Sequence, residues 1–265
     1  MAVWLDVARA MLIAAVMAST APGQSDAFEV ASVRPADPIG NPIVDFRAYA
    51  GGRVVVTNYT LKMLTAASYG VWVYRVMGGP AWADDDLYNI TAKAPVGSAA
   101  AAFMPAEAYE FASPELLPMM RTLLADRFGL KLHHETRRLP ALALMVGKGR
   151  PKLEPALDPS GDAQWPRRKE QNEWRSITMR KLVDILEAHY GRIVLDRTGL
   201  TGTYDFRLSY DPRVRGTDDN PDLPADPTQI SLKVALETQI GLRLEETKGA
   251  VQVLVIDQAK RPTAN

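Results

Sequence analysis

Three histidines and one acidic run are the side chains in this sequence most suited to binding a metal ion. His133 and His134 are adjacent, His189 stands alone, and residues 84–86 are all aspartate. Adjacent side chains on a strand point to opposite faces, so one ion cannot easily be bound by both His133 and His134. The acidic run lacks the alternating oxygen ligands and central glycine of a calcium-binding loop. The sequence therefore predicts no metal site and no cofactor.

Recognisable catalytic motifs are also missing. The chain contains no cysteine, which excludes thiol nucleophiles, disulfides and thiolate metal sites. It has no Gly-x-Ser-x-Gly motif for a serine nucleophile, and the sequence GKG at 147–149 is too short for a phosphate-binding loop. A pair of carboxylates that cleaves a polymer cannot be recognised from spacing alone. We therefore name no catalytic residue, and keep open an exported hydrolase acting on cell-wall or extracellular polymer.

The sharpest local motif is DRTGLTG, residues 196–202. Its two glycines permit tight turns, and the side chains of Asp196 and Thr198 can accept hydrogen bonds from the backbone of the turn. The motif is interpreted either as a turn that locks the next strand or as a recognition loop in which Arg197 binds a carboxylate. Trp82, in GGPAW, is either a core side chain or an anchor for a partner. Asp196, Arg197 and Trp82 are our candidate binding residues.

The charge of the chain is balanced, with 31 basic and 31 acidic side chains in 265 residues. That balance removes the usual electrostatic basis for binding nucleic acid or an anionic membrane surface. Hydrophobic residues make up 47% of the chain and charged residues 23%. These values are typical of a globular protein and argue against wholesale disorder.

The N-terminus has the pattern of a secretory signal peptide. Arg9 precedes an apolar run at 10–18, and small and polar residues follow as far as Ala27. The run is too short to cross a bilayer, which takes roughly 20 apolar residues. An amphipathic first helix is the alternative interpretation. We expect residues 1–27 to be a signal peptide and the mature chain to be periplasmic or secreted, with no membrane span.

Four segments have the pattern of an amphipathic helix that ends at a glycine: 60–70, 113–129, 177–191 and 231–241. Three of them contain a Thr or Ser at the start that can cap the helix. The final glycine suits the left-handed position after a helix. The residues that follow the second and fourth segments are alike, GLKL and GLRL, and both lead into apolar strand-like runs.

This repetition predicts an α+β fold of two similar small modules, each ordered strand-helix-strand-helix-strand-strand, with helices packed on mostly antiparallel sheets. The first module covers residues 28–148 and the second 175–265, joined by a linker at 149–174 that is rich in Pro, Gly and charge. An acidic loop at 211–230 interrupts the second module. Recurrence of helix–glycine–strand units by chance is the alternative to duplication.

Several segments in a fixed order resemble the "Soli" family, an uncharacterised secreted domain multiplied in soil acidobacteria. They are FEVASVRP (28–35), GGPAW (78–82), LLADRFGLKLHHETRRLPALAL (123–144), DRTGLTGTYDF (196–206) and VLVIDQAKRPTAN (253–265). Some family members are fused to BlaR-type membrane metallopeptidases, on the sensor side. Each half more distantly resembles the short N-terminal signalling modules of secretins and TonB-dependent receptors. The resemblance implies export and no established activity, and it supplies no catalytic residue.

The sequence therefore favours an exported, non-catalytic binding or signalling module of the cell envelope. Its partner is expected to be an envelope protein or a small extracellular ligand. A pocket of clustered carboxylates with strongly shifted pKa values would favour the hydrolase. An open strand edge or an exposed apolar patch would favour partner binding.

Overall fold

The computed structural model describes residues 26–37, 43–102, 115–161, 163–164, 172–211 and 230–263. The predicted signal peptide at 1–27 and the acidic loop at 211–230 lie almost wholly outside these residues, as does part of the linker at 149–174. Within the described residues, no helix is long and apolar enough to cross a membrane. Helices and mostly antiparallel sheets are both present, so the predicted α+β class is confirmed.

The chain forms two compact units, and each unit is assembled from separate stretches of sequence. The first contains residues 1–59, 87–128 and 262–265, and the second contains 60–86 and 129–261. This division differs from the successive modules expected from the sequence, because residues 60–86 and 129–148 belong with the second half of the chain.

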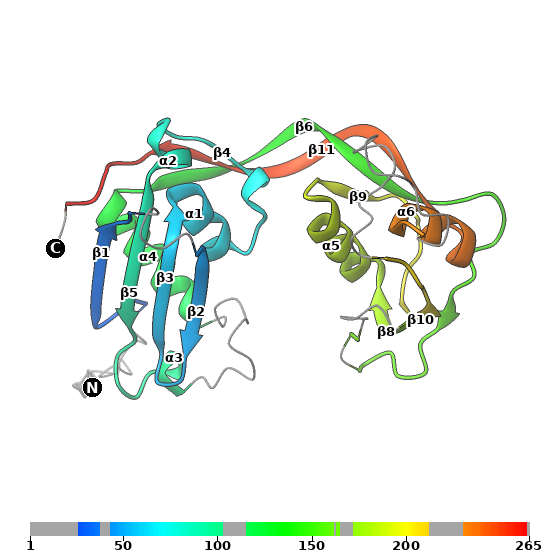
Figure 1. The fold of residues 1–265 in the computed structure, drawn as a ribbon, viewed down its shortest axis with the longest axis horizontal. Coiled ribbons are helices and arrows are strands. Elements are labelled where there is room, and N and C mark those ends of the chain that lie inside the picture. Colours follow the sequence, from blue (N-terminus) through cyan, green and yellow to red (C-terminus); the bar gives the residue numbers. More distant parts are fainter. Residues whose placement is uncertain are drawn as a thin grey trace, which may run out of the picture. The chain divides into compact units, whose positions relative to one another are not determined.

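A four-stranded sheet with one buried face forms the first unit (Figure 1). Its strands are, in spatial order, β1 (Val30–Pro35), β5 (Leu87–Lys93), β3 (Arg53–Thr60) and β2 (Asp45–Tyr49). Every second side chain of β3 is buried, as expected for a strand with one face on a core. Helices α3 (Ala99–Ala102) and α4 (Leu116–Phe128) complete the unit. Phe128 of α4 meets Tyr88 of β5 edge to face, with ring centroids 5.0 Å apart.

Two long strands dominate the second unit: β6 (Lys131–Val146) and β11 (Leu242–Gln258). They pair antiparallel along their whole length and lie side by side in Figure 1. A three-residue parallel strand flanks each of them, β4 (Val76–Gly78) on β11 and β9 (Val194–Asp196) on β6. The apolar runs predicted as strands therefore lie within β6 and β11, which are distant in the sequence and pair with each other.

A second sheet in this unit has the order β7-β10-β8 and is antiparallel. Its strands are β7 (Glu154–Pro155), β10 (Thr203–Arg207) and β8 (Glu173–Thr178). Helix α5 (Met179–Tyr190) and helix α6 (Leu232–Ala235), which continues as the π-helix η2 (Leu236–Ile240), share one apolar core with this sheet. The unit also contains α1 (Leu61–Tyr69), the 3-10 helix η1 (Val73–Arg75) and α2 (Trp82–Asp85).

The predicted helix ends are confirmed where the structure describes them. The hydroxyl of Thr60 accepts a hydrogen bond from the N–H of Met63 at 3.2 Å, and α1 then ends at Gly70 with φ of 63°. Ser231 caps α6 in the same way. The predicted cap Ser113 lies outside the described residues. Thr178, which the sequence did not single out as a cap, begins α5.

Candidate functional site

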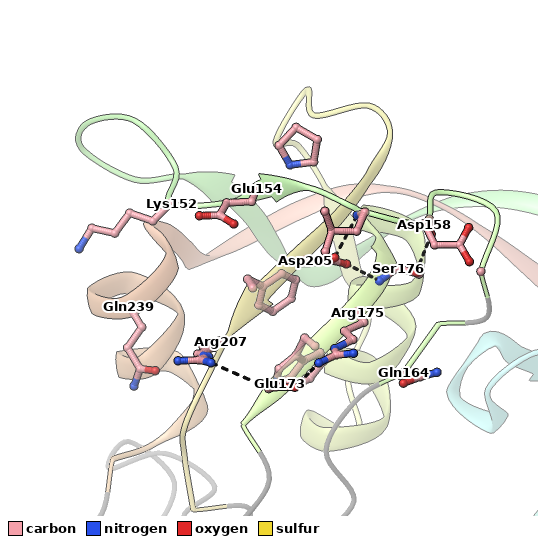
Figure 2. A pocket seen from close by; sticks show the side chains of 15 residues that line it. Lys152, Glu154, Asp158, Gln164, Glu173, Arg175, Ser176, Asp205, Arg207 and Gln239 are labelled. Atoms are coloured by element: carbon pink, nitrogen blue, oxygen red, sulfur yellow. Dashed lines mark hydrogen bonds and ion pairs between the residues drawn. The ribbon is translucent and has the colours of Figure 1, made fainter.

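A groove of about 910 Å³ lies on the β7-β10-β8 sheet of the second unit (Figure 2). Its lining combines basic and acidic side chains from the strands and from the segment around β7: Lys152, Glu154, Glu173, Arg175, Asp205 and Arg207. A concave surface with converging polar groups is the usual form of a small-molecule or peptide site. The groove is therefore the candidate functional site among the described residues.

Two stacked aromatic rings on the inner side of the sheet hold its strands in place. Trp174 of β8 and Phe206 of β10 lie 5.4 Å apart, centroid to centroid, with their planes inclined by 18°. Both are buried, and the indole N–H of Trp174 donates to the carbonyl of Leu208 at 3.3 Å. Because side chains alternate along a strand, the residues next to these rings face outward. The sheet thus buries most of these two aromatic residues, which also line part of the groove, and presents its charged residues to the groove.

One carboxylate in the groove binds two guanidinium groups. Glu173 accepts a hydrogen bond from Arg175 at 2.6 Å and another from Arg207 at 3.4 Å. The hydrogen bond from Arg175 is the main reason that the pKa of Glu173 lies below its ordinary value. The Arg175 and Arg207 side chains are 61% and 78% exposed. Each guanidinium carries five N–H groups, so donors remain for a ligand.

The carboxylate of Asp205, on strand β10, helps to build the wall of the groove. Its two oxygens accept hydrogen bonds from the backbone N–H of Ser176 at 2.8 Å and of Leu157 at 3.1 Å. The hydroxyl of Ser176 in turn donates to the carbonyl of Asp158 at 2.8 Å. Asp205 therefore joins β10 to β8 and to the segment after β7, with one backbone N–H bound to each of its oxygens.

The predicted turn at 196–202 has the internal hydrogen bonds expected of it. Asp196 Oδ1 accepts from the N–H of Thr198 at 2.9 Å and from its hydroxyl at 2.8 Å, and the Thr198 oxygen accepts from the N–H of Leu200 at 3.1 Å. The guanidinium of Arg197 donates to the Thr247 hydroxyl at 3.3 Å. Asp196 and Arg197 are exposed, yet neither lines the groove.

Trp82 lies elsewhere in the second unit, at the start of α2. The guanidinium of Arg261 lies 5.3 Å from the centre of its ring. The side chain is half-buried, which fits an interaction that anchors residues after β11 to α2. The structure does not bring Trp82 together with Arg197, because Arg197 contacts the first half of β11 and Trp82 contacts the segment that follows its end.

The histidines and aspartates considered as metal ligands are dispersed. His133 bonds through Nδ1 to both oxygens of Asp257, at 2.9 and 3.0 Å, and its Nε2 lies 3.8 Å from Glu135. Asp84 pairs with Lys62 at 2.7 Å. In the described part of the chain, no group of three His, Asp or Glu side chains has an arrangement that could hold a metal ion.

The sequence did not predict the groove, because several of the residues that line it lie in the segment predicted to be a linker. In and just after β10, Tyr204, Phe206 and Leu208 alternate with polar residues, which is the pattern of a strand with one buried face. The partner strand β8 begins at Glu173, inside the segment assigned to the linker at 149–174. The alternation of Trp174, Arg175 and their neighbours was the signal that could have extended the module, but it is too short to stand out from the charged residues before it.

The family comparison covers both the groove and the long strand pair. The model of a family described as "Protein of unknown function (DUF3738)" matches residues 62–259. The chain belongs to this family. The DUF3738 match confirms the expectation of an uncharacterised domain, while the resemblances to the Soli family and to secretin and TonB-type modules stay predictions. No curated protein and no solved structure matches the chain.

Proposed function

We propose that this protein is an exported, non-catalytic binding or signalling module of the cell envelope, and that its groove binds a carboxylate. The carboxylate belongs to a small extracellular ligand or to an acidic side chain of an envelope protein. The observation that carries this proposal is the pair of exposed guanidinium groups on Arg175 and Arg207, which share Glu173. Arginine binds carboxylates through paired N–H groups, which gives both affinity and orientation.

The state of the groove carboxylates supports binding rather than hydrolysis. A general acid needs a carboxyl group whose pKa is raised toward the working pH. The pKa of Glu173 is lowered instead, because Arg175 and Arg207 stabilise its charge. Each oxygen of Asp205 accepts a hydrogen bond from a backbone N–H, which fixes this carboxylate as part of the groove wall. These arrangements suit a rigid recognition surface.

Export is supported by the signal-peptide pattern of residues 1–27, with Arg9 before the apolar run. Intact-mass analysis of protein from the producing cell tests it. A mature chain that begins near Phe28 and is found outside the cytoplasm is the expected result. Recovery of the chain from the cytosol with Met1 still attached would contradict export.

We also infer that the two halves arose by duplication. A backbone conformation that occurs at equivalent positions in both halves supports this inference. Asn58 and Ser176 have positive φ angles of 56° and 54°, and each lies two residues before the threonine that caps the next helix. The N–H of Asn58 donates to the side-chain oxygen of Asn89 at 3.0 Å. In the same way, the N–H of Ser176 donates to the side-chain oxygen Oδ1 of Asp205 at 2.8 Å. A shared ancestor accounts for two copies of so unusual a conformation.

The strand registers support duplication independently. Gly241 follows Gly129 by 112 residues. Residues 142–144 of β6 pair with β9, and residues 254–256 of β11 pair with β4. These two sets of residues are separated by the same 112 positions. Each half thus contributes one long strand and one short strand, and the short strand of each half pairs with the long strand of the other.

Affinity capture tests the binding function. The purified mature protein is immobilised and exposed to envelope extract, and the bound material is identified by mass spectrometry. A variant with both Arg175→Gln and Arg207→Gln is expected to lose roughly tenfold or more in affinity, since hydrogen bonds to charged groups contribute about 1.5–3 kcal/mol. Arg180→Gln, which removes an exposed guanidinium on α5 outside the groove, is the matched control.

Equal capture by the double variant and the wild type would reject the groove as the binding site. The hydrolase alternative predicts a different result: release of soluble fragments from cell-wall polymer by the wild type, and loss of that activity in Glu154→Gln or Glu173→Gln. Such activity would show that the protein is catalytic.

A further inference from the structure

One edge of the long strand pair is open over several residues of β11. The carbonyl of Ile256 accepts a hydrogen bond from Gly79, next to β4, at 3.0 Å. Backbone groups of every second residue in a strand point the same way. The N–H and C=O groups of Glu246, Lys248 and Ala250 therefore point away from β6, on the β4 side. Because β4 pairs only with residues 254–256, these groups have no strand partner among the described residues.

The equivalent edge of β6 is less suited to pairing. Strand β9 covers residues 142–144, which leaves His134, Thr136 and Arg138 on the open part. Pro140 follows in the same outward series and has no N–H to donate. Proline on an edge is a common protection against unwanted strand pairing. The open part of β11 has no proline, so every outward N–H there is available.

We propose that the open edge of β11 pairs with the same edge of a second copy of this chain to form a two-fold symmetric dimer. The charged side chains on the edge favour a second copy of the chain as the partner. With Thr247 on the symmetry axis, the two edges run antiparallel, and Glu246 of each copy lies opposite Lys248 of the other. A two-fold contact repeats every pair, so this register forms two opposite-charge pairs.

The side chains needed for these pairs are accessible. Glu246 and Lys248 are both exposed, and the Glu246 side chain retains 68% of its surface. Arg192 holds the Glu246 carboxylate through two hydrogen bonds, at 2.7 and 2.8 Å. Arg192 thus fixes the position of the carboxylate and keeps it ionised before the second copy arrives. A foreign strand would need a matching charge pattern, whereas a second copy always carries it.

Sedimentation of the purified mature protein over a range of concentrations tests the proposal. A concentration-dependent dimer is expected below about 100 µM, within the range of ordinary specific association. Lys248→Pro removes one outward N–H of β11 and is expected to weaken the dimer by about tenfold or more. Arg138→Pro removes one outward N–H of β6 and is the matched control, with no effect on the dimer.

A second experiment, which exchanges the charges at positions 246 and 248, tests the dimer without the backbone effects of a proline substitution. Lys248→Glu alone and Glu246→Lys alone place like charges opposite each other and weaken the homodimer. When the two variants are mixed, both opposite-charge pairs are restored, so native mass spectrometry should find the heterodimer in excess of either homodimer. A wild type that stays monomeric up to about 100 µM, equal effects of the two proline variants, or no excess of heterodimer would each overturn the proposal.

Discussion

The backbone N–H of Ser176 donates a 2.8 Å hydrogen bond to Oδ1 of Asp205 on the neighbouring strand. This contact lies at a β-bulge, where Arg175 and Ser176 of β8 together lie opposite Asp205 of β10. A bulge adds one residue to a strand and redirects the side chains around it. Here it lets Trp174 and Ile177 both enter the core, while Arg175 faces the groove. One hydrogen bond therefore links the core of the sheet to its candidate binding surface.

Removal of the Asp205 carboxylate should loosen this bulge. Asp205→Ala leaves the N–H of Ser176 without its acceptor, and we expect the free energy of unfolding to fall by about 1–3 kcal/mol. Asp205→Asn keeps one acceptor oxygen for the N–H of Ser176, as Asn89 does for Asn58, and loses only the acceptor of the exposed Leu157 N–H, so it should lose less than Asp205→Ala. Urea unfolding followed by circular dichroism measures both. Equal losses for Ala and Asn would show that the hydrogen bond is not the stabilising feature.

Glu187 is a buried carboxylate that joins α5 to two other elements. It is 3% exposed, accepts the N–H of Val194 at 2.9 Å and forms an ion pair with Arg75 of η1. Glu187→Ala leaves both partners unpaired, and we expect a loss of about 2–4 kcal/mol in unfolding free energy. Asp184→Ala removes an exposed ion pair on the same helix and should change stability by less than about 0.5 kcal/mol. Similar losses for the two variants in thermal or urea unfolding would contradict a special role for Glu187.

The core of the second unit should be sensitive to truncation of its helices. Leu186 of α5 and Leu236 at the start of η2 are fully buried in the same cluster. Either residue changed to alanine is expected to cost about 2–5 kcal/mol, which includes the cavity left behind. Val234→Ala, at a side chain that is 48% exposed, is the control and should cost far less. Wild-type-like unfolding midpoints for the leucine variants would refute this packing.

Tyr74 should give a pH dependence at the alkaline end. Burial raises the pKa of its hydroxyl above the ordinary value, and the negative charge of Glu187 raises it further. A raised pKa in the folded protein stabilises the fold below about pH 10, and this contribution is lost as pH rises through the folded-state value. The stability advantage of the wild type over Tyr74→Phe should therefore be constant near neutral pH and shrink above about pH 10. Absorbance titration of tyrosinate checks the pKa, and urea unfolding at two pH values checks the stability.

Local patterns in the sequence predicted four helical segments, which contain α1, α4, α5 and α6 with η2, because the causes are local; the short helices α2, α3 and η1 were not predicted. The spacing of Leu182, Val183 and Leu186 requires a buried helix face, and all three are buried. Gly191 allows the left-handed residue that ends α5, with φ of 62°. An amphipathic stripe, a capping hydroxyl and a terminal glycine act within one or two turns, so they can be read without knowledge of the fold.

The candidate groove and the pairing of β6 with β11 could not be predicted in the same way. Leu142 pairs with Glu246, and no local pattern around either residue predicts this pairing. Cross-strand pairing depends on how the rest of the chain folds. Arg175 and Arg207 look like ordinary solvated residues in the sequence, and only the pairing of β8 with β10 places them on one face. The residues predicted for binding, Asp196 and Arg197, belong to a turn whose own hydrogen bonds explain its sequence.

The pairing of β6 with β11 is expected to make folding slow, because the two strands are far apart in the sequence. Val146 pairs with Leu242, and Lys131 pairs with Gln258, so each contact closes a loop of 96 to 127 residues. High contact order slows folding, since the entropy of closing such loops is lost before the contacts form. While the chain is being synthesised, the edge of β6 that pairs with β11 stays unpaired until β11 arrives, and the earlier strand β9 can pair with only three residues of the other edge. If the chain is exported unfolded, a chaperone that binds extended apolar strands would protect β6 during that interval.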